Sequence, residues 1–328
     1  MASFKSQFTC QGRQMGSLKW LVAPLSQEPQ RSGILFHIII GLPAAAFGLS
    51  ISGCSSAGHN AASSLRLESR LNEQIVMLPV QTEGRTVELE TTLYKPPGNG
   101  PFPLLLMNHG KNPGNARTQP RSRHLEIASV FVHRGFAVAI PMREGFAASG
   151  GQYPKDGCDV RRHAFDEAKD SAAALKELVK LPYVDRARIV IAGQSDGGLV
   201  AMALSTRQIP GVLGVINFSG GLRMKTCAGW QQNLVNAYGS IGKQARYPSL
   251  WFYGDNDQLW PQPLPQQMFS AYTSQATGAA SRARMVDIGT FGQNSHDFAD
   301  SKAGVKRWYP QVETFVHSLG LPFEPVFK

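Results

Sequence analysis

Cysteines, long apolar runs and blocks of basic residues are scarce in this sequence, and each scarcity excludes a class of protein. Four cysteines in 328 residues are too few for a disulfide-dense scaffold. Only one run, Ile34 to Ile51, approaches the length needed to span a bilayer, so the chain is not a polytopic membrane protein. The net charge is +10, but Lys and Arg never occur in blocks longer than two and no aromatic residues alternate with them, so we expect no nucleic-acid partner.

Motifs that bind metals and cofactors are missing as well. The chain has no His-Glu-x-x-His, no paired Cys-x-x-Cys, no Walker loop and no Gly-x-Gly-x-x-Gly after a strand. We therefore expect no metal and no cofactor. With 42% hydrophobic and 17% charged residues, the composition is that of an ordinary globular protein.

The amino-terminal segment has the layout of a secretory signal. Residues 1–33 carry four basic residues and a single acid, the apolar run follows, and small residues lie after it. The tetrad Ile51-Ser52-Gly53-Cys54 resembles a bacterial lipobox, which implies lipid attachment at Cys54 and cleavage before it. The protein would then be anchored by its lipid on the periplasmic side of a bacterial membrane, with inner or outer membrane left open.

We interpret 1–53 as a signal or anchor segment and 54–70, which is small and polar, as a flexible tether. An uncleaved membrane helix is the alternative, and translation starting at Met15 is a second open point.

Two cysteines, Cys158 and Cys227, remain in the globular part. In an oxidising compartment such a pair is expected to form a disulfide, which here would pin the long irregular segment 142–161 beside the site described below. Two unrelated buried thiols are the alternative.

Short apolar runs alternate with amphipathic stretches from residue 73 onward. The runs predict strands near 73–80, 85–94, 102–108, 136–141, 187–192, 212–218, 249–253 and 283–289. Helical spacing predicts helices over 122–134, 162–180, 197–207, about 229–238, 264–275 and 305–319. The pattern predicts a hairpin for the first two strands and a parallel sheet for the later ones. We therefore interpret 71–328 as one α/β domain.

A serine follows one of these strands at a sharp turn. The segment Gly193-Gln194-Ser195-Asp196-Gly197 lies between an apolar strand and a predicted helix. The G-x-S-x-G pattern alone is weak evidence, but between a strand and a helix it is typical of a nucleophile elbow. Ser195 is therefore the candidate nucleophile.

A serine nucleophile needs a base, and the base needs an acid that orients it. Two later strand ends supply candidates: Asp257, with Asp255 as its nearest rival, and then His296. The order serine, acid, histidine along the chain is the one expected for an elbow of this kind.

From about 73 to 322 the chain resembles the α/β-hydrolases, most closely their dienelactone-hydrolase and prolyl-oligopeptidase-like branch. The residues that carry the resemblance are Tyr183-Val184-Asp185 before the elbow strand, the Gly254-to-Pro261 loop and His296-Asp-Phe. It implies about eight mostly parallel strands flanked by helices without a large cap domain. It also implies that Asp257 orients His296, which acts as general base and acid.

The same resemblance implies an oxyanion hole built from the main-chain N–H groups of Asp196 and Lys111. His109 is expected to brace that loop rather than to react. One departure limits the comparison: typical dienelactone hydrolases have cysteine at the elbow where this chain has Ser195, so their lactone substrate is not carried over.

Three functions remain open from the sequence. The first is a serine esterase acting outside the cytoplasm on small-molecule carboxylic esters through an acyl-enzyme. The second is a peptidase or amidase of the same mechanism on short peptides, and the third is a binding lipoprotein that retains the fold without turnover. Arg143, Phe146 and Tyr153 are candidates for lining the pocket, and Trp260 is either a pocket wall or a core residue.

Overall fold

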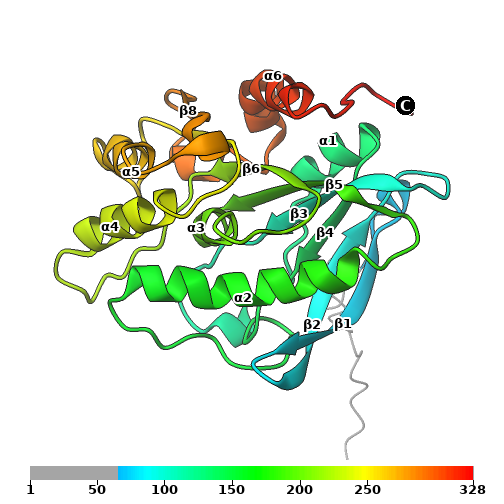
Figure 1. The fold of residues 1–328 in the computed structure, drawn as a ribbon, viewed down its shortest axis with the longest axis horizontal. Coiled ribbons are helices and arrows are strands. Elements are labelled where there is room, and N and C mark those ends of the chain that lie inside the picture. The colour runs from blue at the N-terminus through cyan, green and yellow to red at the C-terminus, as the bar shows by residue number, and fades with distance from the viewer. Residues whose placement is uncertain (1–65, 328) are drawn as a thin grey trace, which may run out of the picture. The chain divides into compact units, whose positions relative to one another are not determined.

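The computed structural model describes residues 66–327, which form a sheet of eight strands with helices on both of its faces (Figure 1). The predicted signal segment 1–53 and the predicted lipidation site Cys54 lie outside the described residues. The predicted tether over 54–70 enters them only at its end. There Ser69–Leu71 forms a short 3-10 helix capped by the Glu68 side chain, so ordered structure begins earlier than the sequence predicts.

The sheet is mostly parallel, as expected. Its strands lie in the order β1-β2-β4-β3-β5-β6-β7-β8, and only the β1–β2 and β2–β4 pairs are antiparallel. In chain order they are β1 (Gln74–Thr82), β2 (Arg85–Tyr94), β3 (Phe102–Asn108), β4 (Ala137–Pro141), β5 (Val184–Gln194), β6 (Val212–Phe218), β7 (Ser249–Tyr253) and β8 (Ala283–Asp287). The carboxyl ends of β3 to β8 therefore meet at one edge of the sheet, where ligand sites of parallel sheets form.

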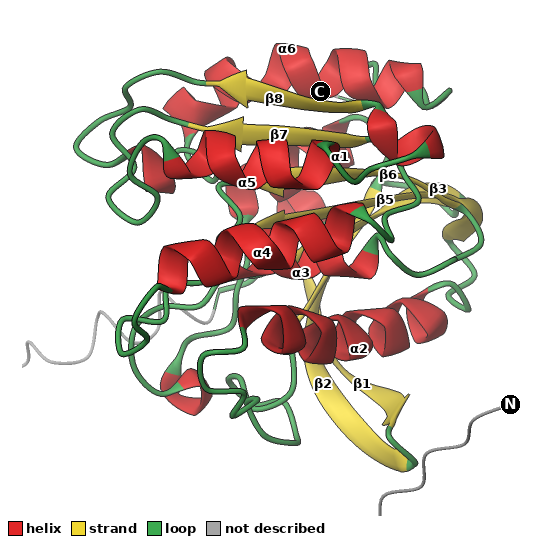
Figure 2. Ribbon diagram, turned by 60° about the vertical axis from the view of Figure 1, so that its left-hand side comes forward, coloured by secondary structure: helices red, strands yellow, loops and turns green. Residues whose placement is uncertain are grey.

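Six α-helices cover the two faces (Figure 2). They are α1 (Leu125–His133), α2 (Val160–Leu178), α3 (Asp196–Leu204), α4 (Trp230–Gly242), α5 (Leu264–Thr273) and α6 (Lys302–Ser318). Buried side chains of α2, α3, α4 and α5 share one apolar core with one face of the sheet, and those of α1 and α6 share a second core with the other face. Burial on both faces explains why the central strands are continuously apolar.

Local sequence accounts for several element boundaries. The β1–β2 hairpin turns at Glu83 and Gly84, which both have positive φ (48° and 81°), the conformation that a two-residue hairpin loop requires. Helix α2 begins at Val160 because the Asp159 side chain accepts the Arg162 N–H at 2.8 Å and caps the first turn.

Strand β5 is longer than the predicted 187–192. It begins at Val184, which pairs with Phe102 of β3, although residues 185, 186 and 188 are charged. These charged residues do not form an apolar run, so the sequence pattern does not predict this part of the strand. Pairing with β3 supplies the hydrogen bonds that extend β5 to Val184.

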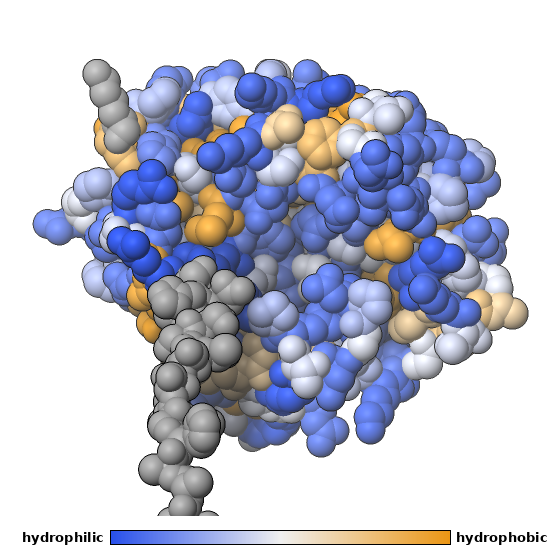
Figure 3. All heavy atoms as spheres, turned by 180° about the vertical axis from the view of Figure 1, so that it is seen from behind, coloured by the Kyte–Doolittle hydropathy of each residue, from blue (hydrophilic) through white to orange (hydrophobic). Residues whose placement is uncertain are grey.

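The face of the molecule shown in Figure 3 is mostly polar. On the face seen in Figure 3, apolar side chains occur only in scattered patches. None of the helices within residues 66–327 is long and apolar enough to span a bilayer.

Candidate active site

Ser195 lies at the turn between the end of β5 and the start of α3. Its backbone has φ 57° and ψ −126°, a strained conformation that non-glycine residues rarely adopt and that is typical of a nucleophile elbow. The neighbouring glycines are required by close packing. A Cβ on Gly193 would lie 1.9 Å from the Gly197 carbonyl oxygen, and one on Gly197 would lie 2.1 Å from that of Asn108. The elbow is therefore pressed against the end of β3.

Asp257 and His296 form a buried pair. His296 Nδ1 lies 3.0 Å from Asp257 Oδ2, and the two residues are 6% and 3% exposed. The other Asp257 oxygen accepts the N–H groups of Leu259 and Trp260 at 2.8 and 3.0 Å. These bonds fix the carboxylate as an acceptor, so His296 Nδ1 donates to it and Nε2 is left without a proton in the neutral ring.

Asp255, the rival for this position, lies elsewhere. Its side chain is exposed, and the negative charge of nearby Asp287 raises its pKa. The structure therefore brings Asp257 and not Asp255 to His296. Trp260, which packs edge-on against the His296 ring at 5.9 Å, is buried in the core.

The turn after β3 lies directly against the elbow. A Cβ on Gly110 would be 3.1 Å from Ser195 Cβ and 2.8 Å from Gln194 Oε1. Within the described residues the N–H of Lys111 has no hydrogen-bond acceptor, and that of Asp196 belongs to the first turn of α3, where no intrahelical acceptor exists. Both predicted oxyanion donors therefore have N–H groups that are available to a ligand.

His109 braces this turn, as predicted. Its Nδ1 donates to the Gly110 carbonyl at 2.8 Å, and its Nε2 accepts the Arg143 N–H at 3.0 Å. Burial and then the positive charge of Arg143 hold the pKa of His109 well below its usual value. The ring is neutral, and both of its nitrogens are engaged by the protein.

A buried ionic cluster that sequence reasoning missed lies behind the elbow. Arg143, only 1% exposed, pairs with Asp196 at 2.9 Å and with Glu167 at 3.2 Å. His163 lies 3.3 Å from Glu167 and 3.7 Å from Asp196. Arg143 and Phe146 were expected to line an open pocket, and the structure instead buries both. His163 belongs to the same cluster.

The cluster contains opposite charges that compensate each other. Burial alone lowers the pKa of His163, but the negative charges of Glu167 and Asp196 outweigh it and raise that pKa to about 9. Burial and the charge of Glu167 raise the pKa of Asp196 to about 7. For Glu167 burial opposes ionisation, yet Arg143 and His163 hold its pKa below the usual range.

His163, Glu167 and Asp196 also stand close enough together to ligate a metal ion, since one atom from each lies within 4.8 Å of the others. The guanidinium of Arg143 is already placed against both carboxylates, where the cation would have to bind. The donor set therefore fits an internal ion pair better than a resident metal.

A signal for the cluster exists in the sequence but is faint. His163 and Glu167 are spaced i, i+4 on α2 among the buried alanines Ala164 and Ala168. Charged residues within an apolar helical stripe indicate buried partners, but the sequence does not say which.

The predicted disulfide is present. Cys158 and Cys227 are bonded, with their Cα atoms 5.6 Å apart. The bond joins the segment before α2 to the segment between β6 and α4, so it ties together two of the connections at the sheet edge where Ser195 lies.

Removing the disulfide is expected to destabilise the fold without changing the catalytic groups. The two cysteines are 69 residues apart, and closing a loop of that size in the unfolded chain corresponds to about 4 kcal/mol. Cys158→Ser/Cys227→Ser should lower the Tm by about 10 °C in a thermal melt. The wild type under reducing conditions should behave like the double variant. A Tm within about 2 °C of the oxidised wild type would contradict this expectation.

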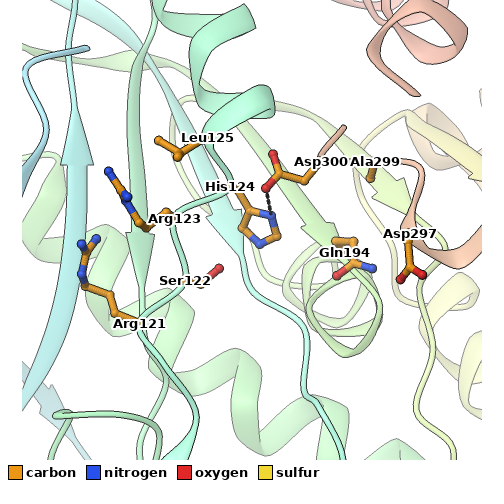
Figure 4. Close-up of a pocket in the computed structure, with 9 residues that line it drawn as sticks. All are labelled: Arg121, Ser122, Arg123, His124, Leu125, Gln194, Asp297, Ala299 and Asp300. Carbon is orange, nitrogen blue, oxygen red and sulfur yellow. Dashed lines mark ion pairs between the residues drawn. The ribbon is translucent and has the colours of Figure 1, made fainter. Parts of the chain in front are cut away.

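A pocket of about 380 Å³ lies next to the elbow and the histidine loop (Figure 4). It is lined by Arg121, Ser122, Arg123, His124, Leu125, Gln194, Asp297, Ala299 and Asp300. Two of these residues are chain neighbours of the candidate catalytic groups, since Gln194 precedes Ser195 and Asp297 follows His296. The pocket therefore lies within reach of a molecule held at the elbow.

The walls of this pocket carry opposite charges. Arg121 and Arg123, on one side, are ion-paired with buried Glu73. On the other side, Asp300 accepts main-chain N–H groups from the first turn of α1 and lies 3.8 Å from His124 Nδ1. The Nε2 atom of His124 is buried and has no hydrogen-bond partner among the described residues. The pocket thus combines charged and neutral polar groups with an apolar lining.

Comparisons with known proteins match parts of this chain. Residues 123–212, which include the elbow but neither Asp257 nor His296, match the model of the prolyl oligopeptidase family. The chain is 30% identical over 146 residues to the quorum-quenching protein AidA of Acinetobacter baumannii, a match that covers 44% of this chain and 45% of that protein. The matched region thus spans less than half of this relative's length.

Solved structures share the fold at low sequence identity. A puromycin-hydrolyzing peptidase of Mycobacterium tuberculosis superimposes with a TM-score of 0.56 at 19% identity, over 78% of this chain and 41% of that one. The acylaminoacyl peptidase of Pyrococcus horikoshii gives 0.54 at 14% identity, over 78% and 43%. The esterase Pf2001 of Pyrococcus furiosus gives 0.55 at 16% identity, over 78% of this chain and 94% of that one.

The mostly parallel sheet, the elbow and these neighbours together identify the fold. The predicted fold class is confirmed: the chain has the α/β-hydrolase fold of peptidases and esterases, and the family match supports a serine hydrolase.

Proposed function

We propose that this protein is a serine hydrolase that cleaves carboxylic esters, with Ser195 as nucleophile, His296 as general base and acid, and Asp257 as the residue that orients His296. The observation that carries the proposal is the combination of Ser195 at a strained elbow with the buried Asp257–His296 pair. A serine hydroxyl is a weak nucleophile unless a base removes its proton, and a histidine held in one tautomer by a carboxylate supplies that base.

The reaction proceeds in two halves. Ser195 Oγ attacks the ester carbonyl carbon while its proton passes to His296 Nε2, and the carbonyl oxygen becomes an oxyanion held by the N–H groups of Lys111 and Asp196. The tetrahedral intermediate collapses as His296 gives that proton to the leaving alcohol, which leaves an acyl-enzyme. Water then attacks the acyl carbon, its proton passes to His296 and on to Ser195, and the carboxylic acid is released.

The structural neighbours include both esterases and peptidases. The superposition covers 94% of the Pyrococcus furiosus esterase, against 41% and 43% of the two peptidases, and we take this fuller match as support for ester substrates. The resemblance to the dienelactone-hydrolase branch stays a prediction, and a peptidase or amidase of the same mechanism is the alternative.

We also propose that the protein works outside the cytoplasm, lipid-anchored through Cys54 on the periplasmic side of a bacterial membrane. The Cys158–Cys227 disulfide supports this location, because disulfides persist in oxidising compartments. The lipobox-like tetrad ending at Cys54 supports the anchor.

The test compares esters with amides on the same protein. Residues 55–328 are assayed with p-nitrophenyl acetate, butyrate and octanoate and with aminoacyl p-nitroanilides. We expect kcat/KM for the best ester to exceed that for the best amide at least about 100-fold, a difference of about 3 kcal/mol in transition-state binding. Faster cleavage of the amides would favour the peptidase. No turnover of either class by well-folded protein would favour a binding lipoprotein.

Quorum quenching is a second candidate role, favoured by the sequence identity to the Acinetobacter baumannii relative. A serine hydrolase would perform it by opening an ester or amide bond of a signal molecule. Incubating culture extracts with the protein should abolish the response of a quorum-reporter strain, and Ser195→Ala should leave the response intact.

A further inference from the structure

Arg143 contacts both segments from which an oxyanion hole would be built. It follows β4 by two residues, and its guanidinium donates from Nη1 to the His109 carbonyl at 2.7 Å and from Nη2 to Asp196 Oδ2 at 2.9 Å. Its own main-chain N–H donates to His109 Nε2 at 3.0 Å. One side chain therefore makes hydrogen bonds to the turn after β3 and to the residue after Ser195.

The β3–β5 ladder fixes the register of the two segments up to the ends of the strands. Beyond the ladder, the turn from His109 to Lys111 touches the elbow through glycines, where Gly110 lies against Ser195 and Gly197 lies against the end of β3. Van der Waals contact alone would leave the turn and the elbow free to shift slightly relative to each other. Directional hydrogen bonds to both segments from one rigid group restrict that shift.

Arginine suits this position because its planar guanidinium donates in several directions at once. Nη1 donates to the His109 carbonyl and Nη2 to Asp196, while Nε lies 3.2 Å from Glu167 as an ion pair. The Phe146 ring, 5.2 Å from the guanidinium carbon, covers it, and His163 lies between the two carboxylates. The guanidinium is thus held in one orientation by charge on one side and by an aromatic ring on the other.

We propose that Arg143 is a positioning residue for ester hydrolysis: it holds the His109–Lys111 turn and Asp196 in register, so that the N–H groups of Lys111 and Asp196 converge on one oxyanion. This inference rests on the proposed function. It assigns to Arg143 no contact with substrate. Its contribution appears only when the oxyanion forms, because the ground-state carbonyl oxygen depends less on the exact placement of the two donors.

The experiment compares Arg143→Lys with Arg134→Lys on the purified protein. Lysine in place of Arg143 keeps the positive charge but cannot bridge His109 and Asp196. Arg134→Lys makes the same substitution after α1, where the arginine donates to Tyr309 Oη at 3.0 Å and stacks on that ring. Each variant is assayed with the best p-nitrophenyl ester well below its own Tm.

Arg143→Lys should lower kcat about 30- to 300-fold, somewhat less than the about 10²- to 10³-fold lost with an oxyanion donor, because the donors are displaced and not removed. KM should stay within about threefold of wild type. Its affinity for a trifluoromethyl ketone, which forms a tetrahedral adduct with serine, should fall by a similar factor. Arg134→Lys should keep kcat within about threefold even where its Tm drops, because it changes packing beside α1 and not the two donors.

Three results would overturn the inference. The first is a kcat for Arg143→Lys no lower than that of Arg134→Lys, and the second is a loss that appears in KM rather than in kcat. The third is unchanged affinity for the ketone. If Arg143→Lys does not fold, Asp196→Asn tests the same link from the other side. It weakens the bond to Nη2 and should lower kcat at constant KM, and a wild-type kcat in that variant would also overturn the inference.

The proposed function fails separately. Wild-type protein that neither turns over esters nor reacts at Ser195 with a fluorophosphonate would reject the hydrolase, and the inference with it. Labelling and turnover in wild type, with no selective effect of Arg143→Lys, would reject only the role of Arg143.

Discussion

Ser195→Ala should lower kcat for p-nitrophenyl esters by about 10⁴- to 10⁶-fold, the largest effect expected of any single substitution in this chain. Ser195 Oγ is the only protein atom that forms a bond to the acyl group in the proposed mechanism, so no neighbouring group replaces it. The residual rate should be that of unassisted attack by water within the site. Steady-state release of p-nitrophenol measures the rate of the wild type and the residual rate of the variant.

The controls separate chemistry from folding. Ser195 is nearly buried at a strained turn, so Ser195→Ala should melt within a few degrees of wild type. The matched control is Ser240→Ala, on the exposed side of α4, which should keep wild-type kcat. An active Ser195→Ala variant, or an equal loss in both variants, would remove Ser195 from the mechanism.

Asp257→Asn should lower kcat by about 10³- to 10⁴-fold while leaving the fold intact. The amide is the same size as the carboxylate, but it does not stabilise the charge that His296 acquires when it takes the serine proton. It can also present an N–H to His296 Nδ1, which favours the tautomer with its proton on Nε2, where the base must be free. Steady-state release of p-nitrophenol by both proteins at one neutral pH measures the loss.

Asp255→Asn is the matched control for this change, because it makes the same substitution two residues away. Asp255 is exposed and does not contact His296, so its variant should keep kcat within about twofold. If Asp255→Asn were the variant that lost activity, the assignment of the acid would have to move to Asp255 and the observed pairing of His296 with Asp257 would not be the catalytic one.

Most of the fold could be read from the sequence because its pattern is local. A strand buried on both faces needs several apolar residues in a row, and β3, β4, β6 and β7 follow their predicted ranges within a residue or two. Strand β5 begins earlier than predicted because its first residues pair with β3 through backbone hydrogen bonds. Side-chain hydropathy does not indicate such bonds.

Some features of the candidate site could be predicted from the sequence and others could not. The elbow is a short motif whose glycines and serine are adjacent in the chain, so the sequence reveals it. The disulfide could also be predicted, because only two cysteines remained to be paired in the globular part. By contrast, the sequence favours Asp257 over its near neighbour Asp255 only through the resemblance. In the structure the N–H groups of Leu259 and Trp260 and the position of His296 distinguish the two acids.

The α/β architecture, the elbow at Ser195 and the order of the residues proposed for the reaction could be predicted from the sequence alone. The contact of His296 with Asp257 and the link that Arg143 makes between His109 and Asp196 are seen only in the folded chain. The difference lies in the range of the interactions. Hydropathy periods and turn geometry are set by residues a few positions apart, whereas a buried ion pair depends on where strands separated by dozens of residues end along the same edge of the sheet.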